Sequence, residues 1–351
     1  MKFKRLRVFK ISKLSPELPV FREKFSMHAS AIAHPNVALI KYWGKSDATR
    51  NLPAVGSLSV TMGALSTETT VEFDAALEHD VVVLNGHEQP LEQGRLTACM
   101  DALRALAGCD EYVTVTSVND FPTGAGLASS ASGYAALVTA AAAALGIDQD
   151  GSWPGPQILE AARIGSGSAP RSLFGGFVLL GIDEQGTNCR QLLTPDEWPL
   201  SVVVAVTTEN RKAVTSRDGM EQSRLTSPFY EPWIQDHAKD LEAAIRHVEA
   251  RDFFALAELS EHNCLKMHSV MMTTRPALLY WSPVTLACMQ KITSLRADGV
   301  PVFFTIDAGP QVKAVCLPEA LEMVTAALHE IPGVLRIIAG ELGEGARVID
   351  S

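Results

Sequence analysis

The sequence predicts a protein that mixes helices and strands in two domains. Its 351 residues have an ordinary globular composition, 47% hydrophobic and 20% charged, and exceed the usual length of a single domain. Short apolar or alternating runs typical of strands, such as residues 69–73, are interspersed with long runs at helical spacing, such as residues 231–249. A natural boundary lies at residues 198–200. We therefore expect an N-terminal domain over 27–200 and a C-terminal domain over 201–351.

Charge and cysteine usage argue against several classes of protein. The formal net charge of −10 disfavours nucleic-acid binding, although it is compatible with a local basic pocket for an anion. The six cysteines are scattered without a C-x-x-C pair or zinc-ligand spacing, which is typical of reduced residues in a cytosolic protein. No apolar run approaches the ~20 residues that span a bilayer. We expect a soluble, cytoplasmic protein without nucleic-acid or membrane partners.

The first 26 residues differ from the rest of the chain. Residues 1–13 carry basic side chains and no acidic ones, but the apolar segment and small-residue cleavage site of a signal peptide do not follow. We interpret residues 1–26 as a disordered or loosely attached extension.

A loop of small residues at 122–134 runs into an alanine-rich stretch at 135–145 that predicts a buried helix. Such a loop presents backbone N–H groups, serine hydroxyls and the positive end of the helix dipole, which together suit a phosphate. A helix cap beside a close-packing glycine turn is the alternative interpretation. The candidate phosphate-binding residues are Gly124, Gly126, Leu127, Ala128, Ser129 and Ser130.

Two lysines lie four residues apart in the mostly apolar segment 29–45. Burying Lys41 and Lys45 without anionic partners is costly, because desolvation disfavours the charged ammonium. An anionic ligand would supply those partners, and Asn36 lies in the same segment. The alternative is that both lysines extend past an amphipathic strand into water.

A second loop of small residues, 165–176, contains a single cation, Arg171. Serines, glycines and one arginine suit a carboxylate or a phosphate, because a guanidinium binds either group through two hydrogen bonds. The alternative is that Gly175 and Gly176 only mark a bulge before a strand at 177–180.

Two segments of the C-terminal half carry charged candidates. The strand at 302–306 ends at Asp307, and a carboxylate at the end of a rigid strand is a typical place for a catalytic group. An aspartate that opens a turn for local reasons is the alternative. Residues 210–220 form a basic loop with hydroxyl groups, which includes Lys212.

Four blocks together indicate a family. In chain order they are Lys41-Tyr-Trp-Gly-Lys45, Pro122-Thr-Gly-Ala-Gly-Leu-Ala-Ser-Ser-Ala-Ser132, Gly165-Ser-Gly-Ser-Ala-Pro-Arg-Ser-Leu-Phe-Gly-Gly176 and Asp307-Ala-Gly-Pro310. From about Ala29 onward the chain resembles the diphosphomevalonate decarboxylases of the GHMP kinase superfamily, which also contains galactokinase, homoserine kinase and mevalonate kinase. The second block is shared across that superfamily, whereas the first and third are specific to the decarboxylase branch.

The resemblance implies a two-domain α+β GHMP-kinase-like fold. Its N-terminal domain would be ribosomal-protein-like, its C-terminal domain ferredoxin-like, and the active-site cleft would lie between them. The implied reaction is the ATP-dependent decarboxylation of (R)-5-diphosphomevalonate to isopentenyl diphosphate, ADP, phosphate and CO2, through phosphorylation of the 3-hydroxyl, as in the mevalonate pathway of isoprenoid biosynthesis. ATP and Mg2+ are the implied cofactors, and a homodimer is the implied assembly.

The resemblance also implies roles by motif position. Asp307 matches the catalytic aspartate beside the 3-hydroxyl, Arg171 the arginine that holds the substrate carboxylate, and Ser130 the serine that orients the ATP phosphates. Lys45 and Lys212 match lysines near the diphosphate or the transferring phosphoryl group. Mg2+ is expected to bind mainly through the ATP phosphates, with Ser130 as its candidate protein ligand. The implied substrate-contacting residues are Asn36, Lys41, Tyr42, Ser166, Ser168 and Arg171, and Lys41 joins the catalytic set.

Three positions depart from the family pattern. Pro170 stands where a small residue or a cysteine usually precedes the arginine, and it should stiffen the loop. Gln311 follows the fourth block where asparagine is common, and Ala-His-Pro-Asn36 replaces the usual Ala-Pro-x-Asn. These departures bear on substrate geometry more than on reaction class.

Two other functions stay open at this point. A sister enzyme would act on the monophosphate as a phosphomevalonate decarboxylase, or phosphorylate the 3-hydroxyl without decarboxylation; the joint presence of Lys41, Arg171 and Asp307 argues against the kinase alone. A noncatalytic ligand-binding protein on the same fold is the second. The sequence lacks the G-x-x-x-x-G-K-[ST] signature, which disfavours a P-loop ATPase.

Overall fold

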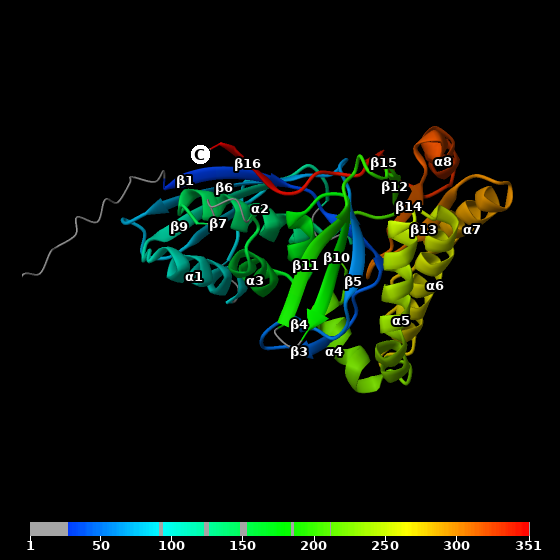
Figure 1. The fold of residues 1–351 in the computed structure, drawn as a ribbon, viewed down its shortest axis with the longest axis horizontal. Coiled ribbons are helices and arrows are strands. Elements are labelled where there is room, and N and C mark those ends of the chain that lie inside the picture. The colour runs from blue at the N-terminus through cyan, green and yellow to red at the C-terminus, as the bar shows by residue number, and fades with distance from the viewer. Residues whose placement is uncertain are drawn as a thin grey trace, which may run out of the picture.

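Two layered halves make up the molecule, in a computed structural model that describes residues 27–90, 94–122, 126–147, 153–183, 186–210 and 212–350. In Figure 1 the strands of the first half extend away from a layer of long helices contributed by the second half. The predicted extension 1–26 and the predicted phosphate-binding residue Gly124 lie outside the described residues.

The N-terminal sheet has the strand order β16-β1-β6-β9-β7-β8, with β7 and β9 parallel and the other neighbours antiparallel. Helix α2 (Ser129–Ala144) lies against β1 and β6, and its buried alanines allow close packing on the sheet. Helices α1 (Arg95–Ala107) and α3 (Pro156–Gly165) pack beside it. The strands are β1 (His28–Ala33), β6 (Thr67–Asp74), β7 (Val81–Leu84), β8 (His87–Glu88), β9 (Tyr112–Asn119) and β16 (Arg347–Asp350).

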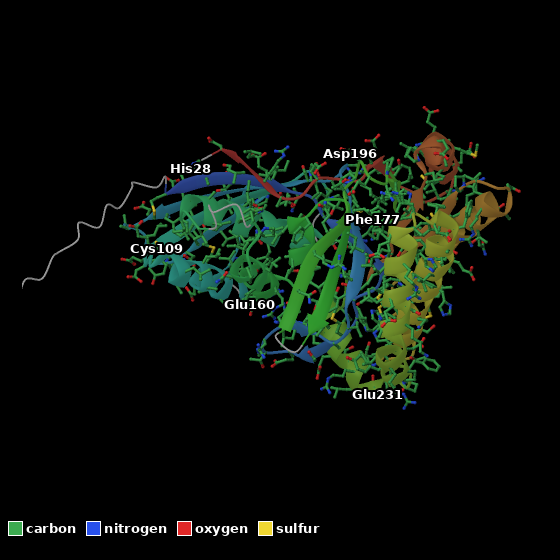
Figure 2. All side chains as sticks on the ribbon, viewed as in Figure 1. His28, Cys109, Glu160, Phe177, Asp196 and Glu231 are labelled. Carbon is green, nitrogen blue, oxygen red and sulfur yellow. The ribbon has the colours of Figure 1, made fainter. Side chains whose placement is uncertain are left out.

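A second sheet, β11-β10-β5-β2, connects this layer to the other half of the molecule. Every residue of β2 and β5 is buried, because helices of the C-terminal half contact both strands. Phe177 at the start of β10, labelled in Figure 2, stacks on Trp198 with ring centroids 4.9 Å apart. The elements are β2 (Asn36–Ile40), β5 (Ser57–Thr61), β10 (Phe177–Asp183), β11 (Gly186–Leu193), the 3-10 helix η1 (Ala169–Leu173) and the short pair β3 (Lys45–Asp47) and β4 (Leu52–Pro53).

The C-terminal sheet is antiparallel with strand order β13-β14-β12-β15. Strands β12, β13 and β14 are buried throughout, and one apolar core joins them to helices α7 and α8. The strands are β12 (Ser201–Val206), β13 (Val302–Thr305), β14 (Val312–Cys316) and β15 (Arg336–Glu341). The helices are α4 (Ser216–Thr226), α5 (Tyr230–Glu249), α6 (Phe253–Met272), α7 (Pro283–Ala297), the 3-10 helix η2 (Pro318–Ala320) and α8 (Leu321–His329).

The two halves are joined by a shared core and by the end of the chain. Phe121 and Leu127 from the first half share one apolar cluster with Phe303 and Val315 from the second. Beyond β15, the Gly343 N–H donates to the Thr61 carbonyl at 2.8 Å, and β16 then pairs with β1. The end of the predicted 201–351 domain thus lies in the N-terminal sheet, and the boundary near residue 200 stays a prediction.

Most elements that the sequence predicts are present, with one informative difference. The turn at Asn85 and Gly86 joins β7 and β8 with φ values of 50° and 77°, as the Asn-Gly signal predicts. Residues 216–226, however, form helix α4, although the sequence analysis interpreted 210–220 as a loop. The Thr215 side chain accepts a hydrogen bond from the Asp218 N–H and caps this helix. No helix in the described part of the chain is long and apolar enough to cross a membrane.

Candidate active site

Two strand ends from the two halves meet at a buried ion pair. Lys41 follows β2, Asp307 follows β13, and Lys41 Nζ lies 2.7 Å from Asp307 Oδ1. The Lys41 side chain is 1% exposed, whereas that of Asp307 is 27% exposed. The lysine is therefore sequestered, and the carboxylate keeps a face that a ligand can reach.

A second lysine approaches the same carboxylate. Lys313 Nζ lies 3.3 Å from Asp307 Oδ2, and it also donates to the Gly126 carbonyl at 2.8 Å. We call Lys41, Asp307 and Lys313 the charge triad. Sequence reasoning missed Lys313, although a lysine within the otherwise apolar strand 312–316 was a visible signal of a buried cation.

The charge triad keeps Asp307 ionised. Burial by itself raises the pKa of this carboxyl, but the Lys41 and Lys313 ammoniums outweigh burial and hold the pKa well below its usual range. Burial likewise lowers the pKa of Lys313, and the Asp307 carboxylate opposes that shift. Asp307 is therefore an anion at any pH near neutrality and a weak proton acceptor.

Helix α6 fixes both ends of the Lys41–Asp307 pair through the backbone. The Asn263 side-chain oxygen accepts from the Lys41 N–H at 2.8 Å. His268 Nε2 lies 3.2 Å from the carbonyl oxygen of Ile306, the residue before Asp307. Burial lowers the pKa of His268 to about 3, so the imidazole is neutral at physiological pH and acts as a hydrogen-bond donor to that carbonyl.

The predicted phosphate loop reaches this pair. Ala128, the N-cap residue of α2, has φ 57° and makes no side-chain cap hydrogen bond, and a helix start of this kind suits an anion. Gly126 has φ 87°, and a Cβ there would lie 3.2 Å from Gly309 Cα. A glycine is thus required where the loop contacts the turn that follows Asp307. Residues 123–125 lie outside the described part of the chain.

Three serines line up between this loop and the second predicted loop. Ser130 Oγ lies 3.2 Å from Ser166 Oγ, which lies 3.2 Å from Ser168 Oγ. The predicted site residues Ser130, Ser166 and Ser168 therefore come together. Next to them, a Cβ on Gly167 would lie 2.7 Å from the Tyr42 hydroxyl, so a glycine allows the ring to approach. Desolvation raises the pKa of Tyr42 to about 12, which keeps its hydroxyl protonated.

Arg171 lies in η1 and is buried. Its Nε donates to Asn36 Oδ1 at 3.1 Å and its Nη1 donates to Ser57 Oγ, while Asn36 Nδ2 donates to Ser172 Oγ at 2.7 Å. The other guanidinium donors have no partner in the described part of the chain. Burial lowers the pKa of Arg171, yet an arginine stays charged in proteins. Pro170, in the first turn of η1, is compatible with the helix because its missing N–H is not needed there.

Two exposed arginines lie within electrostatic range of Lys45. Desolvation and, to a smaller extent, the charges of Arg217 and Arg95 lower the pKa of Lys45 to about 8, against the opposite effect of Asp218. We call Lys45, Arg95 and Arg217 the cation cluster. No ion pair joins these three to a carboxylate within the described residues. Arg95 and Arg217 are exposed and were not among the predicted site residues, although Arg217 lies in the basic segment 210–220.

Lys212 is half-buried and lies just before α4. Its Nζ donates to Ser216 Oγ at 2.8 Å. Burial lowers its pKa, whereas the Asp307 charge raises it and the Lys313 charge lowers it. Lys212 is therefore within electrostatic reach of the charge triad.

Gln311, which follows the fourth block and departs from the family pattern, is fully buried. Its Oε1 accepts from the Thr207 N–H at 2.7 Å, and its Nε2 donates to the Thr208 carbonyl at 2.6 Å.

A cavity of about 250 Å³ opens beside the start of α2. Strands β6, β7 and β9 and the first turns of α2 form its walls; the exposed lining is mainly apolar, and Ser129 and Ser130 lie at the helix end. Such a cavity suits a flat heterocycle whose attached phosphates point at the helix start. Among the described residues, no group of three or more histidine, cysteine, aspartate or glutamate side chains is placed to hold a metal ion.

Comparison with known proteins identifies the family. Residues 33–191 match the model of the diphosphomevalonate decarboxylase-like N-terminal domain, and residues 202–337 match the mevalonate 5-diphosphate decarboxylase C-terminal domain. The chain belongs to the diphosphomevalonate decarboxylase family. The resemblance seen in the four sequence blocks is thereby confirmed, as is the two-domain GHMP-kinase-like α+β fold.

Individual members of the family match over most of their length. The human diphosphomevalonate decarboxylase is 34% identical over 88% of this chain and 82% of its own. The phosphomevalonate decarboxylase of Haloferax volcanii is 34% identical over 92% of this chain and 98% of its own. A solved structure of MDDEF in complex with MVAPP, AMPPCP and magnesium has a TM-score of 0.83 and 36% identity over 92% of this chain and 99% of its own.

Proposed function

We propose that this protein catalyses the ATP-dependent decarboxylation of (R)-5-diphosphomevalonate to isopentenyl diphosphate, ADP, phosphate and CO2. The charge triad beside an open helix N-terminus carries the proposal. Lys41 Nζ contacts Asp307 Oδ1 at 2.7 Å, and Lys313 links Asp307 to the loop before α2. Family membership supports the same activity.

The first chemical step needs an oriented hydroxyl more than a strong base. The 3-hydroxyl oxygen attacks the γ-phosphorus of ATP, the bond to ADP breaks, and the hydroxyl proton passes to the Asp307 carboxylate as the new bond forms. Phosphoryl transfer passes through a loose transition state, so positioning and cancellation of charge dominate. The exposed face of Asp307 orients the hydroxyl. The low pKa of Asp307 suits a mechanism in which the hydroxyl proton leaves late in phosphoryl transfer.

The second step needs a held carboxylate that can still leave. When the C3–O bond to phosphate breaks, the bond to the carboxylate carbon breaks with it, and its electron pair forms the alkene while CO2 departs. We propose that the remaining donors of Arg171 bind this carboxylate, because Nε and Nη1 are already fixed by Asn36 and Ser57. Ser166, Ser168 and Tyr42 lie in the adjoining loops and supply further hydroxyls.

The cation cluster is the proposed diphosphate site. A diphosphate carries more charge than one lysine can neutralise, and Lys45, Arg95 and Arg217 together supply three cations without carboxylate partners among the described residues. This observation favours the diphosphate over the monophosphate. The Haloferax volcanii relative makes the monophosphate the necessary comparison substrate.

ATP and Mg2+ fit the remaining space. The cavity beside α2 would take the adenine base, and the phosphates would meet the uncapped helix start at Ser129 and Ser130, with Lys212 nearby. Mg2+ would bind mainly through the phosphates, with the exposed Ser130 hydroxyl as its candidate protein ligand, since the described residues offer no clustered acidic or histidine ligands. Bound there, Mg2+ neutralises phosphate charge.

The direct test is incubation with ATP, Mg2+ and 5-diphosphomevalonate, with CO2 and ADP measured together. One CO2 for each ADP is the expected result. ADP without CO2 would indicate a 3-kinase and contradict the proposal, and the absence of both products with a bound ligand would indicate a noncatalytic binding protein. The cytoplasmic location expected from composition and the homodimer implied by the resemblance stay predictions, and sedimentation in solution tests the second.

A further inference from the structure

Lys313 occupies a costly position that no sequence motif explains. It lies on β14, an interior strand of the C-terminal sheet, and is 1% exposed. Its neighbours on the strand, Val312 and Ala314, are apolar and fully buried. An apolar side chain would suit such a strand, because an ammonium loses its hydration when buried.

Neutralising Asp307 does not require this second cation. Lys41 already pairs with Asp307 at 2.7 Å, whereas Lys313 is 3.3 Å from the other carboxylate oxygen. The shorter contact of Lys313 is to the Gly126 carbonyl, at 2.8 Å. Lys313 therefore spans two groups that belong to different halves of the molecule.

The two groups have different tasks in the proposed reaction. Gly126 belongs to the loop that opens the phosphate-binding end of α2, and Asp307 faces the hydroxyl that accepts the phosphoryl group. Gly126 also lies against the turn after Asp307, because a Cβ on it would be only 3.2 Å from Gly309 Cα. A rigid link at this point fixes the separation between phosphoryl donor and acceptor, on which transfer depends steeply.

We propose that Lys313 is a positioning residue that ties the phosphate-binding loop to the Asp307 carboxylate and so sets the distance for phosphoryl transfer. The inference rests on the proposed function for the reaction, although the link itself is independent of which substrate is decarboxylated. Lys313 acts through Gly126 and Asp307, and it is not needed to bind the diphosphate.

The test compares Lys313→Met with the wild-type enzyme. The methionine keeps the length of the side chain but removes both hydrogen bonds, so we expect kcat to fall about fiftyfold or more, while KM for 5-diphosphomevalonate changes by less than about threefold. Lys239→Met, at an exposed lysine, is the matched control and should retain wild-type kinetics. A Lys313→Met enzyme with wild-type kcat would overturn the proposal, as would a loss confined to KM.

A double-mutant cycle separates positioning from general loss of structure. If Lys313 acts through Asp307, adding Lys313→Met to Asp307→Asn should lower the residual rate by less than about threefold. Full additivity of the two losses would overturn the proposal. Should Lys313→Met fail to fold, Lys313→Gln replaces it in the same cycle, because its amide retains a donor for Gly126 without the charge.

A binding measurement keeps this inference distinct from the proposed activity. Calorimetry with Mg2+ and AMPPCP reports the state of the phosphate-binding loop without turnover, and we expect Lys313→Met to weaken binding about fivefold while Lys239→Met does not. Unchanged AMPPCP affinity in a folded Lys313→Met protein would overturn the link. A wild-type protein that binds AMPPCP but releases no CO2 would contradict the proposed function. The role of Lys313 would then be tested by comparing the AMPPCP affinities of the wild type and Lys313→Met.

Discussion

The charge triad and the cation cluster hold positive charge in opposite ways. In the triad, Lys41 and Lys313 are each 1% exposed and share one carboxylate, so both cations are fixed in place by the same anion. In the cation cluster, Arg95 and Arg217 are exposed and have no carboxylate partner among the described residues. The difference indicates a division of labour: fixed charges align reacting groups, whereas unpaired charges attract and hold an anionic ligand.

Removing the carboxylate of the triad should have the largest effect on the phosphoryl-transfer step. Asp307→Asn keeps the shape of the side chain but leaves two buried lysines without their anion, and we expect kcat to fall about a thousandfold. Affinity for AMPPCP should stay within about threefold of wild type, since the helix start is intact. Steady-state kinetics and calorimetry check both values. Near-normal turnover would remove Asp307 from the mechanism.

Arg171 forms a third proposed anion site, which belongs neither to the charge triad nor to the cation cluster. Arg171→Ala should abolish measurable CO2 release, because the substrate carboxylate loses its charged donor and Asn36 loses its partner. ADP release in the same assay shows whether phosphorylation persists. A fully active variant contradicts the carboxylate role, and Arg171→Lys, which lacks the planar fork, should not restore activity.

Changes in the cation cluster should act on binding. Arg217→Ala removes one exposed cation, and we expect KM for 5-diphosphomevalonate to rise about tenfold with kcat altered less than about threefold. The KM increase should grow smaller at high salt, because screening already weakens this contact in the wild-type enzyme. A loss confined to kcat would show that the division of labour is wrong.

The smallest expected effect is a pH dependence. Lys45 has a pKa lowered to about 8, so it loses its charge as the pH rises through that value, and kcat/KM for 5-diphosphomevalonate should fall on the alkaline side. In Lys45→Arg, whose side chain stays charged, the alkaline fall in kcat/KM should move to higher pH. Because the pKa of Asp307 is low, kcat/KM should not fall on the acidic side between pH 5 and 7. A pH profile that is flat through pH 9 in the wild type contradicts the assignment.

The sequence predicted most of the charged residues of this site but not Lys313, which joins two of its parts. Lys41, Arg171 and Asp307 stood out because each is a charged residue beside an apolar strand or a small-residue loop. Lys313 did not, because its role depends on Gly126, 187 residues earlier in the chain, and no local pattern encodes that contact. Strand contacts from the end of the chain were missed for the same reason, since Asp350 pairs with Ser30.

Local signals failed differently at α4. Residues 216–226 are polar, contain Gly219 and lack an obvious apolar stripe, so the segment resembled a loop. Tertiary packing favours the helix at residues 216–226, because Gly219 lies against Trp43 and Leu278, where a larger residue would have little room. The helix then places Arg217 in the cation cluster, which explains why that residue was absent from the predicted site.

The most direct measurement is kcat/KM for 5-diphosphomevalonate and for 5-phosphomevalonate, compared in the wild-type and Arg217→Ala enzymes. The division of labour predicts that the wild type prefers the diphosphate by about thirtyfold or more, and that Arg217→Ala narrows this preference while both substrates still give one CO2 for each ADP. Equal values for the two substrates in the wild type, or a preference that Arg217→Ala leaves unchanged, would contradict the account.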